Sequence, residues 1–221
     1  MFAAVEFHDE AQSTDLPALL EVLNETGLPI CGMNTQISVN GGCAAVPELA
    51  DHAKRDVDHA IRIASDIGAK AIHVIAGKAS GAAAHQTYLN TLTHALSNCD
   101  KVILIEPVSW SQIDGYFLRT IDQAANVLAE LDHPRLKIMF DCFHIHSESG
   151  DVLKHFQSNV SNIGHVQISA AENRAEPLPG LLDYRSLLPA FQHAGYSGAF
   201  GCEYRPDNGT DAGLSWMEQF C

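Results

Sequence analysis

The stretch KVILIEPVSW, residues 101–110, shows the pattern on which this chain is built. An apolar run from Val102 to Ile105 is followed at once by the carboxylate of Glu106 and by Pro107. Such a run is typical of a buried strand, and a proline does not continue one. A carboxylate that closes a buried strand costs free energy, because buried charges are normally paired or bound to a metal. We therefore expect a positive partner for Glu106 elsewhere in the fold.

Six further apolar runs of this kind make seven candidate strands in all. They are FAAVEF (2–7), PICGMN (29–34), AIHVIAG (71–77), VILIEP (102–107), LKIMFD (136–141), HVQIS (165–169) and AFGCEY (199–204). Apolar residues at helical spacing lie between several of these runs, within 57–67, 118–131 and 187–191. Apolar strands that alternate with helices predict a parallel sheet covered by helices. The segment GKASGAAA (77–84) is expected to be a flexible loop.

Two architectures satisfy this alternation, an open doubly wound sheet and a (β/α)8 TIM barrel. The first is disfavoured because SVNGGC (38–43) is not a GxGxxG motif and no such motif follows the first strand. A chain of 221 residues suits one barrel domain over residues 1–221. A barrel needs eight strands, so we expect its first strand and helix to be missing from this chain. An unclosed barrel exposes two strand edges.

Charge and cysteine usage exclude several classes of function. The 27 acidic and 13 basic residues give a net charge of −14, which repels nucleic acid rather than binding it. Six cysteines are scattered without a CxxC pair, which indicates reduced thiols; they are Cys31, Cys43, Cys99, Cys142, Cys202 and Cys221. No apolar run is long enough to cross a bilayer, and MFAAVEFHDE lacks signal-peptide features. We expect a soluble, cytoplasmic protein without a membrane partner.

Four of the later strands end in oxygen-bearing side chains. These are Glu106 in LIEP, Asp141 in MFDCFH, Gln167 in HVQI and Glu203 in GCEY. The C-terminal ends of barrel strands converge on one mouth, where these side chains would meet. Three carboxylates and an amide suit Mg²⁺ or Mn²⁺, which would be the cation expected at Glu106. The alternative is that each side chain only caps loop amides, but four buried carboxyl or amide groups in register make this less favoured.

Histidines near the strand ends admit two interpretations each. On a strand, FHIH (143–146) would place His144 and His146 on one face as zinc ligands. The favoured alternative is one hydrogen-bonding histidine and one loop histidine, because no cysteine or second HxH accompanies them. His73 either lines the mouth or is a core histidine, and we include it among the candidate substrate-binding residues. Glu6, at the end of the first strand, is equally ambiguous.

At these strand ends the sequence resembles the hydroxypyruvate isomerase family of xylose isomerase-like TIM barrels. The matching stretches are AVEF, HVIAG, LIEP, FDCFH, IGHVQIS, NRAEP, GYSGAFGCEYRP and GLSWM, which run in order from residue 4 to residue 217. Family members begin about one strand–helix unit earlier, which agrees with the missing strand. The resemblance implies that a divalent metal is held by Glu106, Asp141, Gln167 and Glu203, with the two glutamates as the acid/base pair.

The implied reaction converts hydroxypyruvate to 2-hydroxy-3-oxopropanoate (tartronate semialdehyde). A proton moves between adjacent carbons through an ene-diolate, whose negative charge a divalent cation stabilises. Glu106 and Glu203 are expected to flank this small hydroxy-oxo acid, and His144 to hydrogen-bond a substrate oxygen. Arg174 in NRAEP is suited to the substrate carboxylate, because its planar fork binds bidentately. The alternative is a surface ion pair between Arg174 and Glu176.

Three positions depart from the family pattern. Ala175 replaces a histidine, His146 replaces a glutamine, and GLLDY (180–184) replaces GELNY. These loops shape the mouth, so the reaction type is better defined than the substrate. A 2-oxo-tetronate isomerase or a related sugar epimerase or dehydratase stays open, as does an inactive barrel or one completed by a homo-oligomer. Endonuclease IV-like DNA cleavage is disfavoured by the charge and by the few histidines and cysteines at strand ends.

Overall fold

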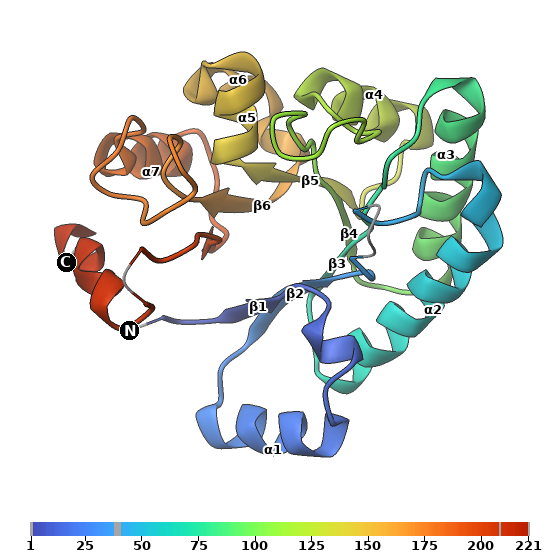
Figure 1. Ribbon diagram of the computed structural model, residues 1–221, viewed down its shortest axis with the longest axis horizontal. Coiled ribbons are helices and arrows are strands. Elements are labelled where there is room, and N and C mark those ends of the chain that lie inside the picture. The colour runs from blue at the N-terminus through green and yellow to red at the C-terminus, as the bar shows by residue number, and fades with distance from the viewer. Residues whose placement is uncertain (1, 38–40, 208, 221) are drawn as a thin grey trace.

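Seven parallel strands form one curved sheet whose spatial order is the order of the chain. The computed structural model describes residues 2–37, 41–207 and 209–220. The strands are β1 (Val5–Phe7), β2 (Ile30–Asn34), β3 (Ala71–His73), β4 (Val102–Ile105), β5 (Leu136–Asp141), β6 (Ile163–Ile168) and β7 (Phe200–Cys202). Figure 1 shows them curling around a common centre, with the helices outside. The prediction of a seven-stranded, TIM-barrel-like fold is confirmed.

Helices connect the strands and cover the outer face of the sheet. They are α1 (Leu16–Thr26), α2 (Ala50–Asp66), α3 (Gly81–Asn98), α4 (Ile121–Leu131), α5 (Cys142–Ser149), α6 (Val152–Asn159) and α7 (Tyr184–His193). Short 3-10 helices are η1 (Glu10–Gln12), η2 (Pro47–Leu49), η3 (Val160–Asn162) and η4 (Ala212–Phe220). The helical patterns expected within 57–67, 118–131 and 187–191 correspond to α2, α4 and α7.

The main core lies between the sheet and its helices. On α2, Val57, Ala60 and Ala64 recur at helical spacing and are fully buried. The strands contribute side chains such as Ile72 and Ile103, which are 0 % exposed. Burying a side chain of this size stabilises the fold by about 1.5–3 kcal/mol. Because helices cover the outer face of the sheet, side chains on both faces of the strands are buried, and the strand sequences are continuously apolar.

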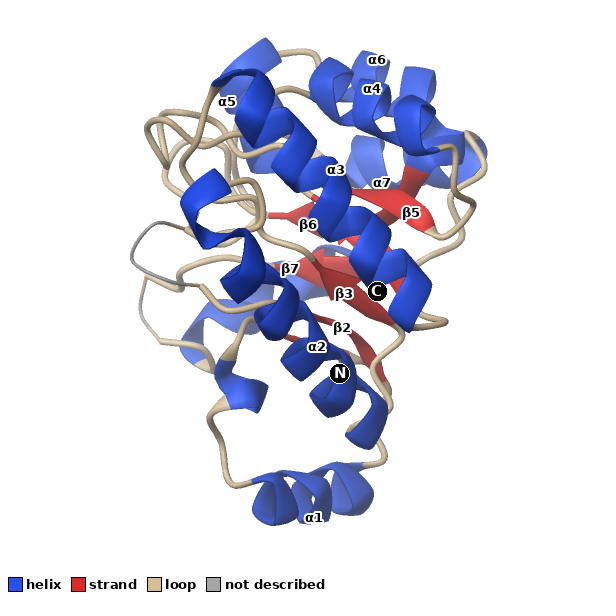
Figure 2. Ribbon diagram, turned by 90° about the vertical axis from the view of Figure 1, so that its right-hand side faces the viewer, coloured by secondary structure: helices blue, strands red, loops and turns tan. Residues whose placement is uncertain are grey.

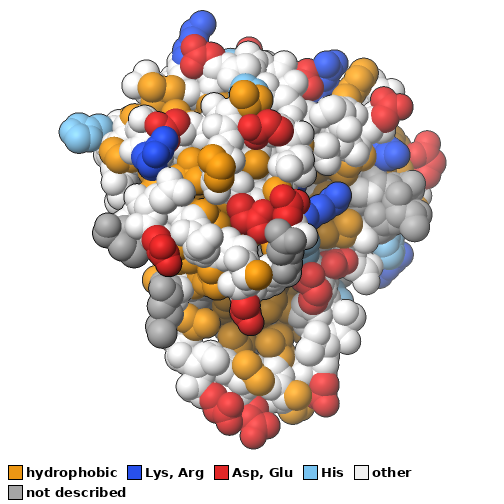
Figure 3. All heavy atoms as spheres, turned by 60° about the vertical axis from the view of Figure 1, so that its left-hand side comes forward, with side chains coloured by type: hydrophobic (Ala, Val, Ile, Leu, Met, Phe, Trp, Pro, Cys, Tyr) orange, Lys and Arg blue, Asp and Glu red, His pale blue; other side chains and the backbone are white. Residues whose placement is uncertain are grey.

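The barrel is open between its first and last strands. In the described part of the chain, β1 pairs only with β2 and β7 only with β6. A groove of about 620 Å³ separates the two free edges and is lined by side chains that include Val5, Leu28 and Phe200. Figure 3, which brings this side forward, shows hydrophobic side chains gathered in a hollow. Below it, α1 projects from the body without one fully buried residue (Figure 2).

One local prediction is wrong. Helix α3 begins at Gly81, so only residues 77–80 of the expected loop lie outside a helix; the alanines that follow favour helix, and Ala84 is fully buried.

The stretch FHIH belongs to α5, whose first turn is capped by the side chain of Asp141, which accepts a hydrogen bond from the Phe143 N–H. The less favoured interpretation, a strand-face zinc site of His144 and His146, is therefore excluded. His144 is the hydrogen-bonding histidine of the favoured interpretation, whereas His146 lies in the last turn of α5 instead of a loop.

Three other sequence observations have simple outcomes. The five cysteines in the described part of the chain are all free thiols, as expected. None of the helices described here has the length and apolar character needed to cross a bilayer. Residues 38–40 of SVNGGC lie outside the described residues, so the structure does not test that stretch.

Candidate active site

The alternation of side chains along the strands brings the candidate residues to one end of the barrel. Three apolar side chains form a separate buried cluster away from the main core: Ala71, Leu104 and Met139. Since alternate side chains of a strand share a face, the residues two positions later point the same way, one level nearer the mouth. These residues are His73, Glu106 and Asp141. Register adds the next strand, because Asp141 lies opposite Gln167.

A cavity of about 300 Å³ opens at this end of the barrel. The predicted site residues that line it are His73, Glu106, His144, Arg174 and Glu203. Asp141 lies beneath them with 1 % of its surface exposed, and Gln167 is 4 % exposed. The structure thus brings residues from β3, β4, β5, β7 and the loop after β6 to one place, as the strand-end pattern predicted.

Arg174 is the positive group that meets these carboxylates. Its Nη1 donates to Asp141 Oδ2 in a very short contact, and its Nη2 lies 2.8 Å from Glu203 Oε2. Although burial opposes a charged guanidinium, the charges of Asp141, Glu203 and Glu106 raise the pKa of Arg174 above its usual value. Arg174 therefore stays charged and joins the ends of β5 and β7.

The backbone holds Arg174 in an unusual conformation. Its φ is 62°, in the left-handed region that a residue with a side chain seldom adopts. Its N–H donates to the Ala170 carbonyl, and its own carbonyl accepts from the Arg205 N–H at 2.7 Å. The expected alternative, a surface pair with Glu176, is wrong: the Glu176 carboxylate accepts from the Asp207 N–H. Backbone strain of this kind is found at sites that need a fixed side-chain direction.

Glu106 is buried among other titratable groups. Its Oε2 lies 3.8 Å from His73 Nδ1 and its Oε1 lies 3.7 Å from His144 Nε2. Burial raises the pKa of Glu106 well above its usual value, and the charges of Glu203 and Asp141 raise it further. Burial and the neighbouring carboxylates thus favour the protonated form of Glu106.

Glu203 has the opposite character. Its Oε1 lies 3.0 Å from His8 Nε2, and its Oε2 lies beside Arg174. Burial opposes ionisation, but the hydrogen bond from His8 and the charge of Arg174 outweigh it and lower the pKa of Glu203 to about 2. The same hydrogen bond raises the pKa of His8. The pKa values of Glu203 and Glu106 are thus displaced in opposite directions.

The two buried histidines at the site are neutral. Burial lowers the pKa of His73 to about 3, and its Nδ1 lies 3.2 Å from Asn34 Oδ1. Burial also lowers the pKa of His144, although the nearby Asp141 charge opposes this. The Ser109 N–H donates to His144 Nδ1 at 3.4 Å, so the proton of the neutral ring resides on Nε2. That N–H faces Glu106 and Asp141.

Gln167 does not line the cavity as Glu106 and Glu203 do, and its side chain contacts Glu6 instead. Its Nε2 donates to Glu6 Oε1 at 3.3 Å, and Glu6 also lies 2.7 Å from His165 Nε2. Sequence reasoning singled out Glu6 but missed His165 and His8. Alternation was the available signal, because His165 stands two positions before Gln167 and His8 two positions after Glu6.

The geometry fits a divalent cation near Glu106 and Asp141. One ligand atom each from Glu106, Asp141 and His144 lie within 4.8 Å of one another. Glu106 Oε1 and Gln167 Oε1 are buried acceptors without a hydrogen-bond partner in the described structure. Buried acceptor oxygens of this kind are hard ligands of the type that Mg²⁺ and Mn²⁺ prefer. His144 lies beside this cluster and directs its Nε2–H toward it, whereas Glu203 is connected to it through Arg174.

Comparison with known proteins agrees with the barrel and its site. The family model described as "Xylose isomerase-like TIM barrel" matches residues 2–220. The chain belongs to this family. It is 36 % identical over 186 residues to 2-oxo-tetronate isomerase of Cupriavidus necator, covering 81 % of this chain and 72 % of the relative. It is 32 % identical over 186 residues to hydroxypyruvate isomerase of Escherichia coli, with the same coverage. The expectation of an isomerase enzyme is thereby confirmed.

Solved structures share the xylose isomerase-like fold. The crystal structure of an AP endonuclease, family 2, from Brucella melitensis superposes with a TM-score of 0.93 at 25 % identity, covering 99 % of this chain and 88 % of that one. The structure of 3-keto-D-glucoside 4-epimerase from E. coli gives a TM-score of 0.82 at 19 % identity, covering 100 % and 90 %. The second likeness concerns the fold alone.

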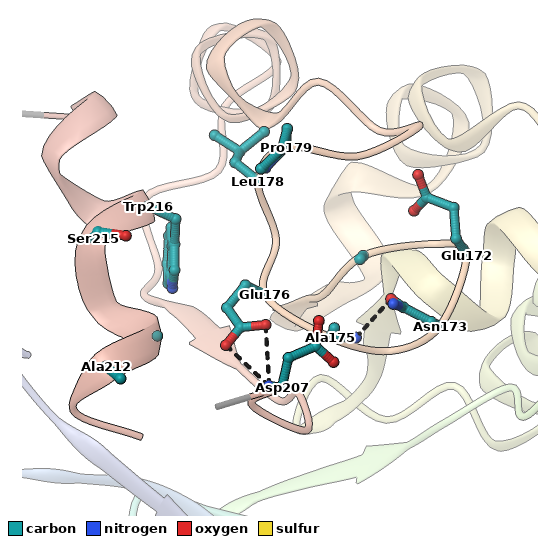
Figure 4. Close-up of a pocket in the computed structure, with 12 residues that line it drawn as sticks. Glu172, Asn173, Ala175, Glu176, Leu178, Pro179, Asp207, Ala212, Ser215 and Trp216 are labelled. Atoms are coloured by element: carbon teal, nitrogen blue, oxygen red, sulfur yellow. Dashed lines mark hydrogen bonds between the residues drawn. The ribbon is translucent and has the colours of Figure 1, made fainter. Parts of the chain in front are cut away.

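In this xylose isomerase-like barrel a second cavity lies on the other side of the loop that carries Arg174. It measures about 510 Å³ and is bordered by Ala175, Glu176, Asp207 and Trp216 (Figure 4). Ala175 is buried and borders this cavity rather than the mouth.

Proposed function

We propose that this protein interconverts hydroxypyruvate and 2-hydroxy-3-oxopropanoate. The observation that carries the proposal is the pair Glu106 and Glu203, which line one cavity with pKa values displaced in opposite directions. Two carboxyl groups whose pKa values are displaced in opposite directions can serve one substrate as acid and base. The resemblance of the strand-end motifs and the name of the E. coli relative support this choice of substrate.

The reaction moves one carbon-bound proton and needs no external oxidant. Glu203, whose lowered pKa favours the carboxylate, removes a proton from C3 of hydroxypyruvate and leaves an ene-diolate. Glu106, whose raised pKa favours proton donation, delivers a proton to C2, while the hydroxyl proton of the C3 oxygen passes to the C2 oxygen. The product is the 3-oxo isomer, and the two glutamates exchange roles in the reverse direction.

The proposal includes a divalent cation, Mg²⁺ or Mn²⁺, held by Glu106, Asp141, Gln167 and Glu203. Support comes from the unpartnered oxygens of Glu106 and Gln167 and from the close grouping of Glu106 with Asp141. When bound, the cation would stabilise the negative charge that develops on the ene-diolate oxygens. Gln167 would need to keep its Oε1 directed away from Glu6, which its Nε2 already contacts.

The remaining site residues position the substrate in this proposal. His144 donates its Nε2–H to a substrate oxygen, because its Nδ1 is occupied by Ser109. Arg174 offers the guanidinium N–H groups that Asp141 and Glu203 leave free to a substrate oxygen. His73 Nε2, which has no partner in the described structure, faces the same cavity. At neutral pH His73 and His144 are neutral and Arg174 is charged.

A 2-oxo-tetronate is the second candidate substrate, because the relative from Cupriavidus necator carries that name at 36 % identity. It has the same reacting group on a longer carbon chain, so the same acid/base pair applies. A cytoplasmic location is part of the proposal and rests on the scattered free cysteines. The net charge of −14 disfavours nucleic acid as a partner.

The test is isomerisation of hydroxypyruvate with Mg²⁺ or Mn²⁺ and with a chelator, beside a 2-oxo-tetronate. Glu106→Gln and Glu203→Gln keep the side-chain shape and remove proton transfer, so kcat should fall by roughly 10²–10⁴-fold. Glu130→Gln is the matched control, since Glu130 lies on α4 with an exposed side chain paired to His85. Undiminished turnover in both site variants would refute the acid/base pair, and turnover of neither acid by the natural sequence would refute the function.

A further inference from the structure

A second arginine stands at the mouth of the site. Arg205 follows β7 by three residues and lines the same cavity as Glu106, Glu203 and Arg174. Its side chain is exposed, and within the described residues no acidic side chain forms an ion pair with it. An arginine in this position has no structural task that the rest of the fold explains.

The backbone of Arg205 is held in place although its side chain is free. Its N–H donates to the Arg174 carbonyl at 2.7 Å, which ties the segment after β7 to the loop after β6. The next residue is Pro206, which restricts Arg205 to extended conformations. The direction in which the side chain leaves the main chain is therefore set before any ligand binds.

Arg174 and Arg205 differ in whether their positive charge is already paired with a carboxylate of the protein. Arg174 is 12 % exposed and already contacts two carboxylates, Asp141 and Glu203, so its charge is offset within the protein. Arg205 has no such partner. Arg205 therefore adds a positive charge at the mouth that no carboxylate of the described residues offsets by an ion pair, and such a charge favours an anionic substrate.

We infer that Arg205 binds the carboxylate of the substrate at the mouth and so selects hydroxy-oxo acids over uncharged sugars. This inference rests on the proposed function for the identity of the reacting group. The planar fork of Arg205 meets the carboxylate bidentately. The reacting carbons then extend inward, toward Glu106 and Glu203. Hydroxypyruvate and a 2-oxo-tetronate share this carboxylate, so Arg205 serves both acids.

The test compares Arg205→Gln and Arg205→Lys with the natural sequence. Tartronate, an unreactive dicarboxylate, is titrated calorimetrically, and steady-state constants are measured for hydroxypyruvate and for dihydroxyacetone, its uncharged analogue. Arg205→Gln should weaken tartronate binding about tenfold, equivalent to about 1.4 kcal/mol. It should raise KM for hydroxypyruvate by a similar factor and leave kcat within about twofold. Arg205→Lys should recover part of the loss, and added salt should narrow the difference.

Arg62→Gln is the matched control, because Arg62 is an exposed residue of α2 and the substitution changes the net charge equally. Equal tartronate affinity in Arg205→Gln and Arg62→Gln would overturn the inference. So would an equal loss toward dihydroxyacetone, which would indicate a structural role. If hydroxypyruvate is not isomerised at all, the proposed function fails, but a selective loss of tartronate binding in Arg205→Gln would still establish the carboxylate site.

Discussion

Replacing Arg174 by glutamine tests the charge network on which the site depends. Arg174→Gln leaves the carboxylate of Asp141, which is 1 % exposed, without its cation. Removing one partner of a buried pair costs about 3–5 kcal/mol. Asp141 keeps its hydrogen bond from the Phe143 N–H, and Glu203 is 27 % exposed and keeps His8. We therefore expect the lower end of the range, a loss of about 3 kcal/mol in the free energy of unfolding at pH 7.

The assay is urea denaturation in chelator, with Arg185→Gln as control. Arg185 also pairs with an aspartate, Asp183, but both side chains are exposed. The decrease in the free energy of unfolding in Arg185→Gln should therefore be far smaller. In Arg174→Gln the unpaired carboxyls have raised pKa values, and their penalty disappears as pH falls below their ordinary values near 4. The deficit should therefore be largest at pH 7 and shrink toward pH 4. Mn²⁺ should stabilise the variant more than the natural sequence.

Equal losses in Arg174→Gln and Arg185→Gln would refute this reasoning, because they would show that burial of the Asp141 pair contributes nothing. A deficit that stayed constant from pH 7 to pH 4 would also contradict it, since uptake of protons by Asp141 and Glu203 must relieve the repulsion.

Three further predictions concern the rest of the molecule. Glu106→Gln should raise the free energy of unfolding in chelator, by up to about 1.4 kcal/mol for each pH unit above the ordinary glutamate value, because burial raises the pKa of Glu106; a less stable variant at pH 8 would contradict this. Phe156→Ala should cost about 3–5 kcal/mol in denaturation experiments, since Phe156 is fully buried and stacks on Phe191 at 3.9 Å. The free edges of β1 and β7 should cause self-association that increases with protein concentration in sedimentation experiments. Ala3→Lys, at the exposed rim of the groove, should reduce this self-association. A strictly monomeric protein at high concentration would exclude the homo-oligomer.

Sequence and structure agree best where local patterns decide the outcome. The apolar runs predicted each strand, and the side chains at their ends predicted where Glu106, Asp141 and Glu203 would gather. At FHIH the sequence left two interpretations open, and the structure places the stretch in a helix that Asp141 caps. The loop expected at 77–84 was wrong from residue 81 onward, because glycines and a serine outweighed the helix-forming alanines in that interpretation.

The sequence alone determined the order of the strands and the polar residue at the end of each, because alternation and apolar periodicity are properties of neighbouring residues. Tertiary structure decided which partner each polar group meets. Arg174 reaches across 33 positions to Asp141, and His8 reaches across 195 positions to Glu203. The opposite pKa displacements of Glu106 and Glu203 follow from burial and from those distant charges. Such long-range contacts leave no periodic trace in a sequence, so only the folded chain shows them.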